Sequence, residues 1–168
     1  MKTMMDTTFL RQRALALWNE GQQFHVQGDK TGLMRAIDLY TKSIEIYPTA
    51  EAYTFRGWAY SFQKKYDLAI QECKTAIAID PAFGNAYNDI GTYLMAVDKN
   101  EDAITWFEQA KAAKRYDTRH YPFMNLGRLY ASKGMLLRAI HEFEGALEFC
   151  PGEPGCKAAI GEIKNLLN

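Results

Sequence analysis

Three histidines and three cysteines carry the side chains with the most reactive chemistry in this 168-residue chain. They are His25, His120, His141, Cys73, Cys150 and Cys156. Zinc sites usually show as short, repeated Cys and His spacings, and these cysteines are odd in number and follow no such spacing. The pair His141 and Glu144, one helical turn apart, is typical of a surface contact. We therefore expect no metal site and no cofactor.

Other catalytic signatures are equally hard to find. The sequence shows no glycine-rich phosphate loop and no arrangement of Ser, His and Asp or of Cys and His. We expect a non-enzyme without catalytic residues. Twenty basic and twenty acidic residues cancel, which argues against a nucleic-acid surface. Without an apolar run for a signal peptide or a membrane span, we expect a reduced, cytoplasmic protein that does not bind membranes.

One short stretch of the sequence is rich in cations. The stretch K-A-A-K-R-Y-D-T-R-H-Y contains Lys111, Lys114, Arg115, Arg119 and His120, with two tyrosines between them. Cations interleaved with aromatic rings are used to bind single-stranded nucleic acids. Helix C-termini also favour Lys and Arg because of the helix dipole, and with zero net charge we expect a solvated helix end.

An internal repeat organises most of the chain. Gly21, Gly57, Gly91 and Gly127 each lie in an apolar helical pattern and are separated by 36, 34 and 36 residues. Each is followed by an Ala-Ile pair, then by an aromatic residue or Cys, then by Ser or Ala. Small residues let two antiparallel helices approach closely, and the larger side chains fill the space between them. Pro48, Pro81 and Pro151 close three of the four units, because proline ends a helix.

The pattern resembles the tetratricopeptide repeat, a helix-turn-helix unit of about 34 residues. The resemblance implies one domain over residues 1–168, an all-α right-handed solenoid of four helix pairs with a C-terminal capping helix. We place the units at 14–48, 50–81, 84–115 and 120–151 and the cap at 153–167. Unit one has three extra residues around Lys30-Thr31-Gly32, where we expect a bulged turn. Unit three has Arg115 in place of the closing proline, so we expect its second helix to run long.

The stretch Y-T-F-R-G-W-A-Y-S-F, residues 53–62, holds five aromatic side chains. At 100° per residue, Tyr53 and Tyr60 share the packing side with Gly57. The stripe formed by Phe55, Trp58 and Phe62 lies on the opposite side. We expect this stripe to bind a partner through an apolar anchor. The alternatives are cover by the N-terminal segment with Met4, Met5, Phe9 and Leu10, cover by a second copy in a homodimer, and ordinary packing.

In the family that the chain resembles, this sector of each unit's first helix lines a concave peptide-binding groove. The resemblance therefore implies the groove residues Trp18, Asn19, Gln22, Phe55, Trp58, Phe62, Asp89, Thr92, Asn125 and Arg128. The implied function is a non-catalytic scaffold or adaptor that holds a peptide or helix segment of another protein. The alternatives are a structural self-assembling module and a bacterial secretion-type chaperone.

One role of the family depends on cations at set groove positions, which hold the acidic C-terminus of heat-shock chaperones. Two frames can be tried, and the first has Trp18, Gln22, Phe55, Asn85 and Asp89 at the matching places. The second has Thr54, Trp58, Asp89, Tyr121 and Asn125 there. Neither frame supplies the cations, and an ionised Asp89 would repel a carboxylate. We therefore expect no binding of this acidic tail.

Overall fold

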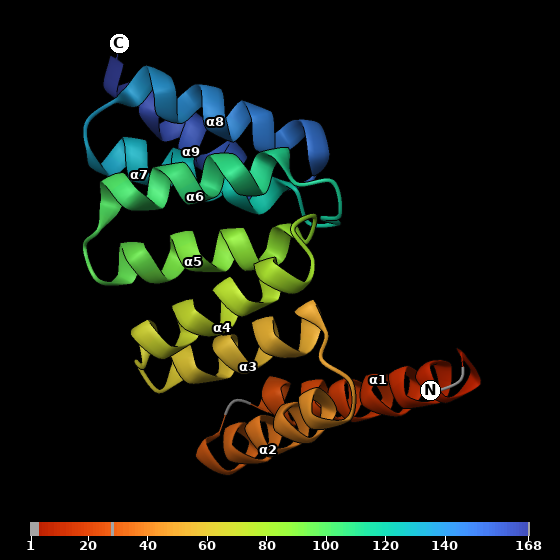
Figure 1. Ribbon diagram of the computed structural model, residues 1–168. Helices are drawn as coiled ribbons and strands as arrows, with labels where there is room; N and C mark the ends of the chain where they lie inside the picture. The colour runs from red at the N-terminus through yellow and green to blue at the C-terminus, as the bar shows by residue number, and fades with distance from the viewer. Residues whose placement is uncertain (1–3, 28, 168) are drawn as a thin grey trace.

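The computed structural model describes residues 4–27 and 29–167, and within these ranges it contains nine α-helices and no β-strand. The helices are α1 (Met4–Gln27), α2 (Lys30–Ile46), α3 (Ala50–Phe62), α4 (Tyr66–Ile79), α5 (Gly84–Ala96), α6 (Asn100–Ala112), α7 (His120–Ser132), α8 (Leu136–Phe149) and α9 (Pro154–Leu167). Successive helices pair as α1·α2, α3·α4, α5·α6 and α7·α8, and the pairs stack into an elongated array (Figure 1). The predicted fold class, an all-α solenoid with a terminal cap, is confirmed.

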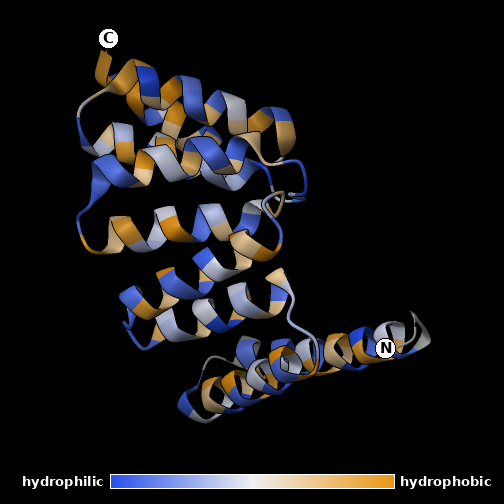
Figure 2. Cartoon of the chain, in the orientation of Figure 1, coloured by the Kyte–Doolittle hydropathy of each residue, from blue (hydrophilic) through white to orange (hydrophobic). Residues whose placement is uncertain are grey.

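Close contacts between a glycine and a ring hold three of the four pairs together, and in α3·α4 Gly57 instead faces Ala69 and Cys73. A Cβ atom on Gly91 would lie 2.6 Å from Cε1 of Phe107, and one on Gly127 would lie 2.6 Å from Cε1 of Phe143. In the first pair Tyr40 presses against Gly21 in the same way. Only glycine leaves room for these rings, so the repeat spacing encodes the helix pairing directly. Each helix carries hydrophilic and hydrophobic segments, because one side faces a neighbour and the other faces water (Figure 2).

The turns inside three pairs share one backbone feature. Lys64, Asp98 and Gly134 each lie seven residues after the repeat glycine and have φ angles of 59°, 59° and 72°. This left-handed conformation ends the first helix and reverses the chain. Glycine adopts it without a steric penalty at 134, whereas Lys64 and Asp98 adopt it with a Cβ atom present.

The extra residues of unit one do not form the expected bulge, and that prediction is wrong for Lys30-Thr31-Gly32. These residues form the first turn of α2. The carboxylate of Asp29 accepts a hydrogen bond from the backbone N–H of Gly32 at 2.7 Å and so caps α2. Counted back from the Ala-Ile pair, α2 begins three residues earlier than the second helix of each other unit. The insertion is therefore absorbed as helix.

The expectation that the second helix of unit three runs long is also wrong, because α6 ends at Ala112. The loop that follows pairs with the preceding inter-unit loop. The backbone N–H of Arg115 donates to the carbonyl of Ala82 at 2.9 Å, and the N–H of Gly84 donates to the carbonyl of Arg115 at 3.0 Å. The ring of Tyr116, only 5% exposed, covers Gly84. These contacts favour a fixed loop over further helix.

Three cations of the basic run contact other parts of the protein: Lys111 near the end of α6, and Arg115 and Arg119 in the loop after it. The guanidinium of Arg115 bonds to Asp80 and Glu51, and Lys111 bonds to Glu142 at 3.1 Å. Arg119 donates to three backbone carbonyls between Lys111 and Lys114, which closes the end of α6. These cations serve the fold.

The capping helix α9 begins at Pro154, which suits the first position of a helix, and packs against α8. From the predicted apolar stripe, Ile163 is buried, and Ala159 and Ile160 pack against the core. Leu166 and Leu167 remain 75% and 50% exposed. The helix covers the open end of the core with its first turns. In the part of the chain that the structure describes, no helix has both the length and the apolarity needed to cross a membrane.

Candidate peptide-binding groove

The odd-numbered helices form one continuous inner row, because α1 contacts α3, α3 contacts α5 and α5 contacts α7. Every groove residue implied by the resemblance lies on this row. The row divides into an aromatic half on α1 and α3 and a polar half on α5 and α7.

In the aromatic half the three rings of the predicted stripe have different environments. Phe55 is half-buried in a small cluster around Tyr40, and Trp18 meets it edge-on at 5.2 Å between ring centroids. Trp58 and Phe62 are 39% and 52% exposed. Ordinary packing therefore accounts for most of Phe55, while Trp58 and Phe62 present apolar surface to solvent.

A buried histidine completes this half. His25 is 2% exposed, and its ring stacks on that of Trp58 with centroids 3.9 Å apart. Its Nδ1 lies 3.1 Å from the hydroxyl oxygen of Tyr40. Burial lowers the pKa of His25 to about 4, so the ring is neutral at physiological pH. His25 was not among the predicted groove residues, although its spacing of seven from Trp18 places both on one side of a helix.

The N-terminal segment does not fold over these rings as one alternative supposed. Residues 4–13 continue α1 as helix, and α1 projects beyond the stack of helix pairs (Figure 1). Phe9 is 63% exposed. The side chains of Met4 and Met5 lie outside the described part of the chain.

The polar half is joined by side-chain hydrogen bonds between α5 and α7. The amide nitrogen of Asn125 donates to Oδ1 of Asn88 at 3.1 Å and reaches Oγ1 of Thr92 at 3.5 Å. Arg128 is exposed one turn further along α7. Asn88 was not among the predicted groove residues. It occupies the same repeat position as Trp18 and Thr54, and its polar side chain at that position could have indicated a role in the groove. On α1, the side-chain amide oxygen of Asn19 accepts from the side-chain amide of Gln22 at 3.3 Å.

A pocket of about 260 Å³ lies where the two halves meet. It is lined by Trp58, Ser61, Phe62, Tyr66, Asp89, Thr92, Tyr93 and Ala96. Burial raises the pKa of Asp89 to about 7, and the amide of Asn88 opposes this shift only in part. Asp89 is consequently not a fixed negative charge at neutral pH. The pocket can accept an apolar side chain beside groups that donate and accept hydrogen bonds.

Comparison with known proteins places this geometry in a family. The profile of the tetratricopeptide repeat matches residues 50–83. The yeast (Saccharomyces cerevisiae) small glutamine-rich tetratricopeptide repeat-containing protein 2 is 32% identical over 95 residues, which are 54% of this chain and 28% of that protein. The chain thus spans less than a third of this relative. It is a tetratricopeptide repeat protein, a family of protein-binding scaffolds that are generally non-catalytic.

Two solved structures add to this. The structure of Pseudomonas aeruginosa pilF has a TM-score of 0.82 at 22% identity, covering 91% of this chain and 68% of that chain, which supports the fold. The second TPR of Spaghetti (RPAP3), bound to the HSP90 peptide SRMEEVD, has a TM-score of 0.56 at 28% identity. That match covers 61% of this chain and 94% of that chain.

The exclusion of an acidic heat-shock tail as a partner is corrected by this last comparison. A similar repeat module is bound to such a peptide, so the absence of matching cations in two assumed frames is not a sufficient reason for exclusion. The prediction assumed a fixed negative charge on Asp89, whereas burial raises the pKa of this carboxyl group to about 7.

Proposed function

We propose that this chain binds a short segment of a partner protein along its inner row of helices. An apolar side chain of the segment lies against Trp58 and Phe62, and its acidic groups and backbone lie toward α5 and α7. One observation carries the proposal: two exposed aromatic rings share a pocket with the polar residues Asp89 and Thr92. In this role the protein is a non-catalytic adaptor of the cytoplasm.

The division of the groove suits a peptide that combines an apolar anchor with carboxylates. Rings that are 39% and 52% exposed gain free energy when a partner covers them, about 25 cal/mol per Å² of apolar surface. Asn125 can exchange its bonds within the protein for bonds to a peptide backbone. Arg128 is an exposed cation on the same helix. The HSP90 peptide SRMEEVD, with one methionine before three carboxylate side chains, belongs to this class of ligand and is the first probe to test.

Titration calorimetry with SRMEEVD tests the proposal directly. We expect saturable binding at one site that weakens with added salt, because carboxylates contribute to it. A peptide with the methionine replaced by serine should bind more weakly, because it lacks the anchor. Phe62→Ala should also weaken binding by about tenfold or more, on the scale of an interface hot spot.

Phe62 is a better probe than Trp58, because Trp58 also covers His25 and its removal would disturb the fold. Phe149 on α8, 50% exposed, provides the matched control: Phe149→Ala removes an equally exposed ring outside the groove and should leave affinity unchanged. Equal affinity of the wild type and Phe62→Ala for the peptide would contradict the proposal that its apolar side chain lies against Phe62. Light scattering run alongside would reveal a dimer that buries the same rings.

A further inference from the structure

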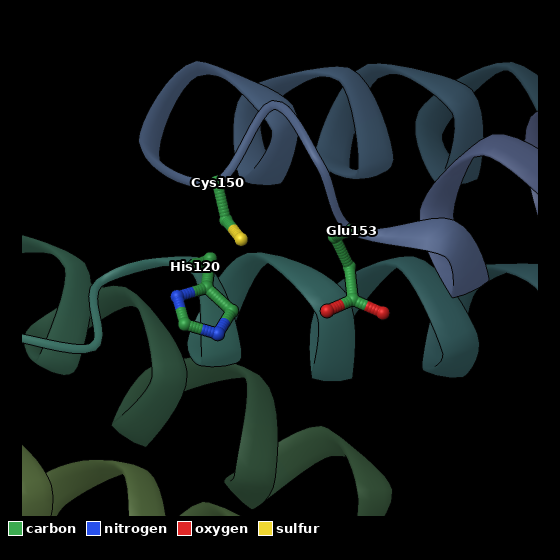
Figure 3. Close-up of side chains that lie close together, drawn as sticks. All are labelled: His120, Cys150 and Glu153. Atoms are coloured by element: carbon green, nitrogen blue, oxygen red, sulfur yellow. The ribbon is translucent and has the colours of Figure 1, made fainter.

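Three side chains of different metal-ligand types converge where α7 begins and α8 ends (Figure 3). They are His120, Cys150 and Glu153, and their ligand atoms lie within 4.8 Å of one another. His120 is the first residue of α7, Cys150 follows the last residue of α8, and Glu153 directly precedes α9. The cluster therefore joins three helices, including the cap.

Backbone contacts hold these residues in place. The N–H of Cys150 donates to the carbonyl of Ala146 at 3.0 Å, and the N–H of Glu153 donates to the carbonyl of Cys150 at 3.1 Å. This tight turn sets the thiol and the carboxylate on the same side. The ring of His120 lies 4.2 Å from that of Tyr121, centroid to centroid, which restricts its orientation. The backbone turn, and not the side-chain conformations alone, therefore brings the three side chains together.

The ligand atoms are available. Within the described residues, neither ring nitrogen of His120 nor the thiol of Cys150 has a hydrogen-bond partner. One oxygen of Glu153 accepts from the N–H of Gly155 at 3.2 Å, which leaves the other oxygen free. All three residues are half-buried, so an ion can reach them while part of its hydration shell is displaced.

We propose that His120, Cys150 and Glu153 bind a zinc ion in a three-ligand site, with a water molecule at the fourth position. Thiolate and imidazole together select zinc or another borderline metal over magnesium and calcium, which prefer oxygen ligands. With bond lengths of about 2.0–2.3 Å, tetrahedral ligand atoms are roughly 3.3–3.8 Å apart. Movements of about 1 Å or less from the present positions therefore close the site.

Binding has a proton balance and a structural consequence. The Cys150 thiol gives up its proton to solvent as the sulfur bonds the metal, while His120 binds as the neutral ring. The affinity must therefore rise with pH. The bound ion links the start of α7 to the connection between α8 and α9, so it fastens the capping helix to the last pair. This role is independent of peptide binding in the groove.

Cobalt(II) is a suitable probe, because its visible absorption reports tetrahedral geometry and its thiolate charge-transfer band reports sulfur ligation. Under reducing conditions we expect one cobalt ion per chain with both features, and displacement by zinc. Zinc should raise the melting temperature with the logarithm of its concentration. Cys150→Ser should abolish the charge-transfer band, and His120→Gln and Glu153→Gln should each weaken binding by at least about tenfold, comparable to the loss of a supporting group.

The chain offers controls for each ligand type. Cys73 and Cys156 are 0% exposed and stay in place as internal thiol controls. His141→Gln removes an exposed histidine elsewhere on α8 and should change nothing. Circular dichroism without metal verifies that every variant folds. The proposal is overturned if no cobalt spectrum appears at saturating metal, or if Cys150→Ser binds cobalt with an unchanged spectrum.

Discussion

The ring of His25 lies against that of Trp58 with their centroids 3.9 Å apart, and this contact joins α1 to α3 within the aromatic half of the groove. The same ring meets Phe62 at 5.5 Å. A neutral histidine suits this position, because a charged imidazolium would lose its hydration among these rings. The first helix pair is thus attached to the second through a group that can titrate.

Acid should therefore loosen the first helix pair. Burial lowers the pKa of His25 from 6.5 to about 4 in the folded state, so folding favours the neutral ring. The corresponding stability is complete above pH 6.5 and is lost as pH falls toward 4, with an upper bound of about 3 kcal/mol. Melting temperature and tryptophan fluorescence measured between pH 7.5 and pH 4 test this window. His25→Phe keeps a ring in place but cannot titrate, and an unchanged pH profile in that variant would rule out His25 as the cause.

A pair of glycine substitutions tests the packing logic of the repeat. Gly91→Ala places a methyl group 2.6 Å from the fully buried ring of Phe107 and should cost about 1–3 kcal/mol in the free energy of unfolding. Gly161 lies inside α9 with no atom within 4 Å of its added Cβ, so Gly161→Ala should gain about 0.5–1 kcal/mol from helix propensity. Urea unfolding measures both. Equal effects at the two positions would show that helix propensity alone governs them.

The contrast between these glycines indicates what the sequence can reveal. Gly91 and Phe107 are 16 residues apart in a recurring pattern, so their contact, and with it the fold, can be predicted from spacing. The pairing of Arg115 with Ala82 joins two loops across a whole helix pair and follows no recurring pattern. Likewise, Cys150 meets His120 only because α7 and α8 pack antiparallel and bring the start of one beside the end of the other. Of the groove, the exposed rings follow from periodicity, but the pKa of Asp89 depends on burial by neighbours from other helices.

The loop after α6 should depend more on its buried ring than on its ion pairs. Arg115 bonds to Asp80 and Glu51, but its side chain is 45% exposed, so Arg115→Gln should cost about 1 kcal/mol or less. Tyr116 is 5% exposed and fills the space above Gly84, so Tyr116→Ala should cost about 3 kcal/mol or more. Urea unfolding of both variants shows whether the ion pairs of Arg115 or the buried ring of Tyr116 contributes more to stability. A larger loss in Arg115→Gln would mean that the ion pairs, and not the ring, fix this loop.

Asp89 should make both stability and peptide binding depend on pH near neutrality. Its pKa rises from 3.8 to about 7 in the folded state because of burial, so the fold favours the protonated acid. The stability from this preference is complete below pH 4 and is lost as pH rises through 7. Asp89→Asn mimics the protonated form permanently. It should therefore unfold like the wild type at pH 4 and be more stable at pH 8, by at most about 4 kcal/mol.

The same titration should govern an acidic ligand. Ionised Asp89 repels a carboxylate in the neighbouring pocket, so the affinity of the wild type for SRMEEVD should fall between pH 6 and pH 8. In Asp89→Asn this fall should disappear, because the amide carries no charge. Glu108→Gln, which removes a half-exposed carboxylate that pairs with Lys111, is the matched control and should retain the wild-type pH profile. If Asp89→Asn loses affinity between pH 6 and pH 8 as steeply as the wild type does, the carboxylates of the peptide do not bind near this residue.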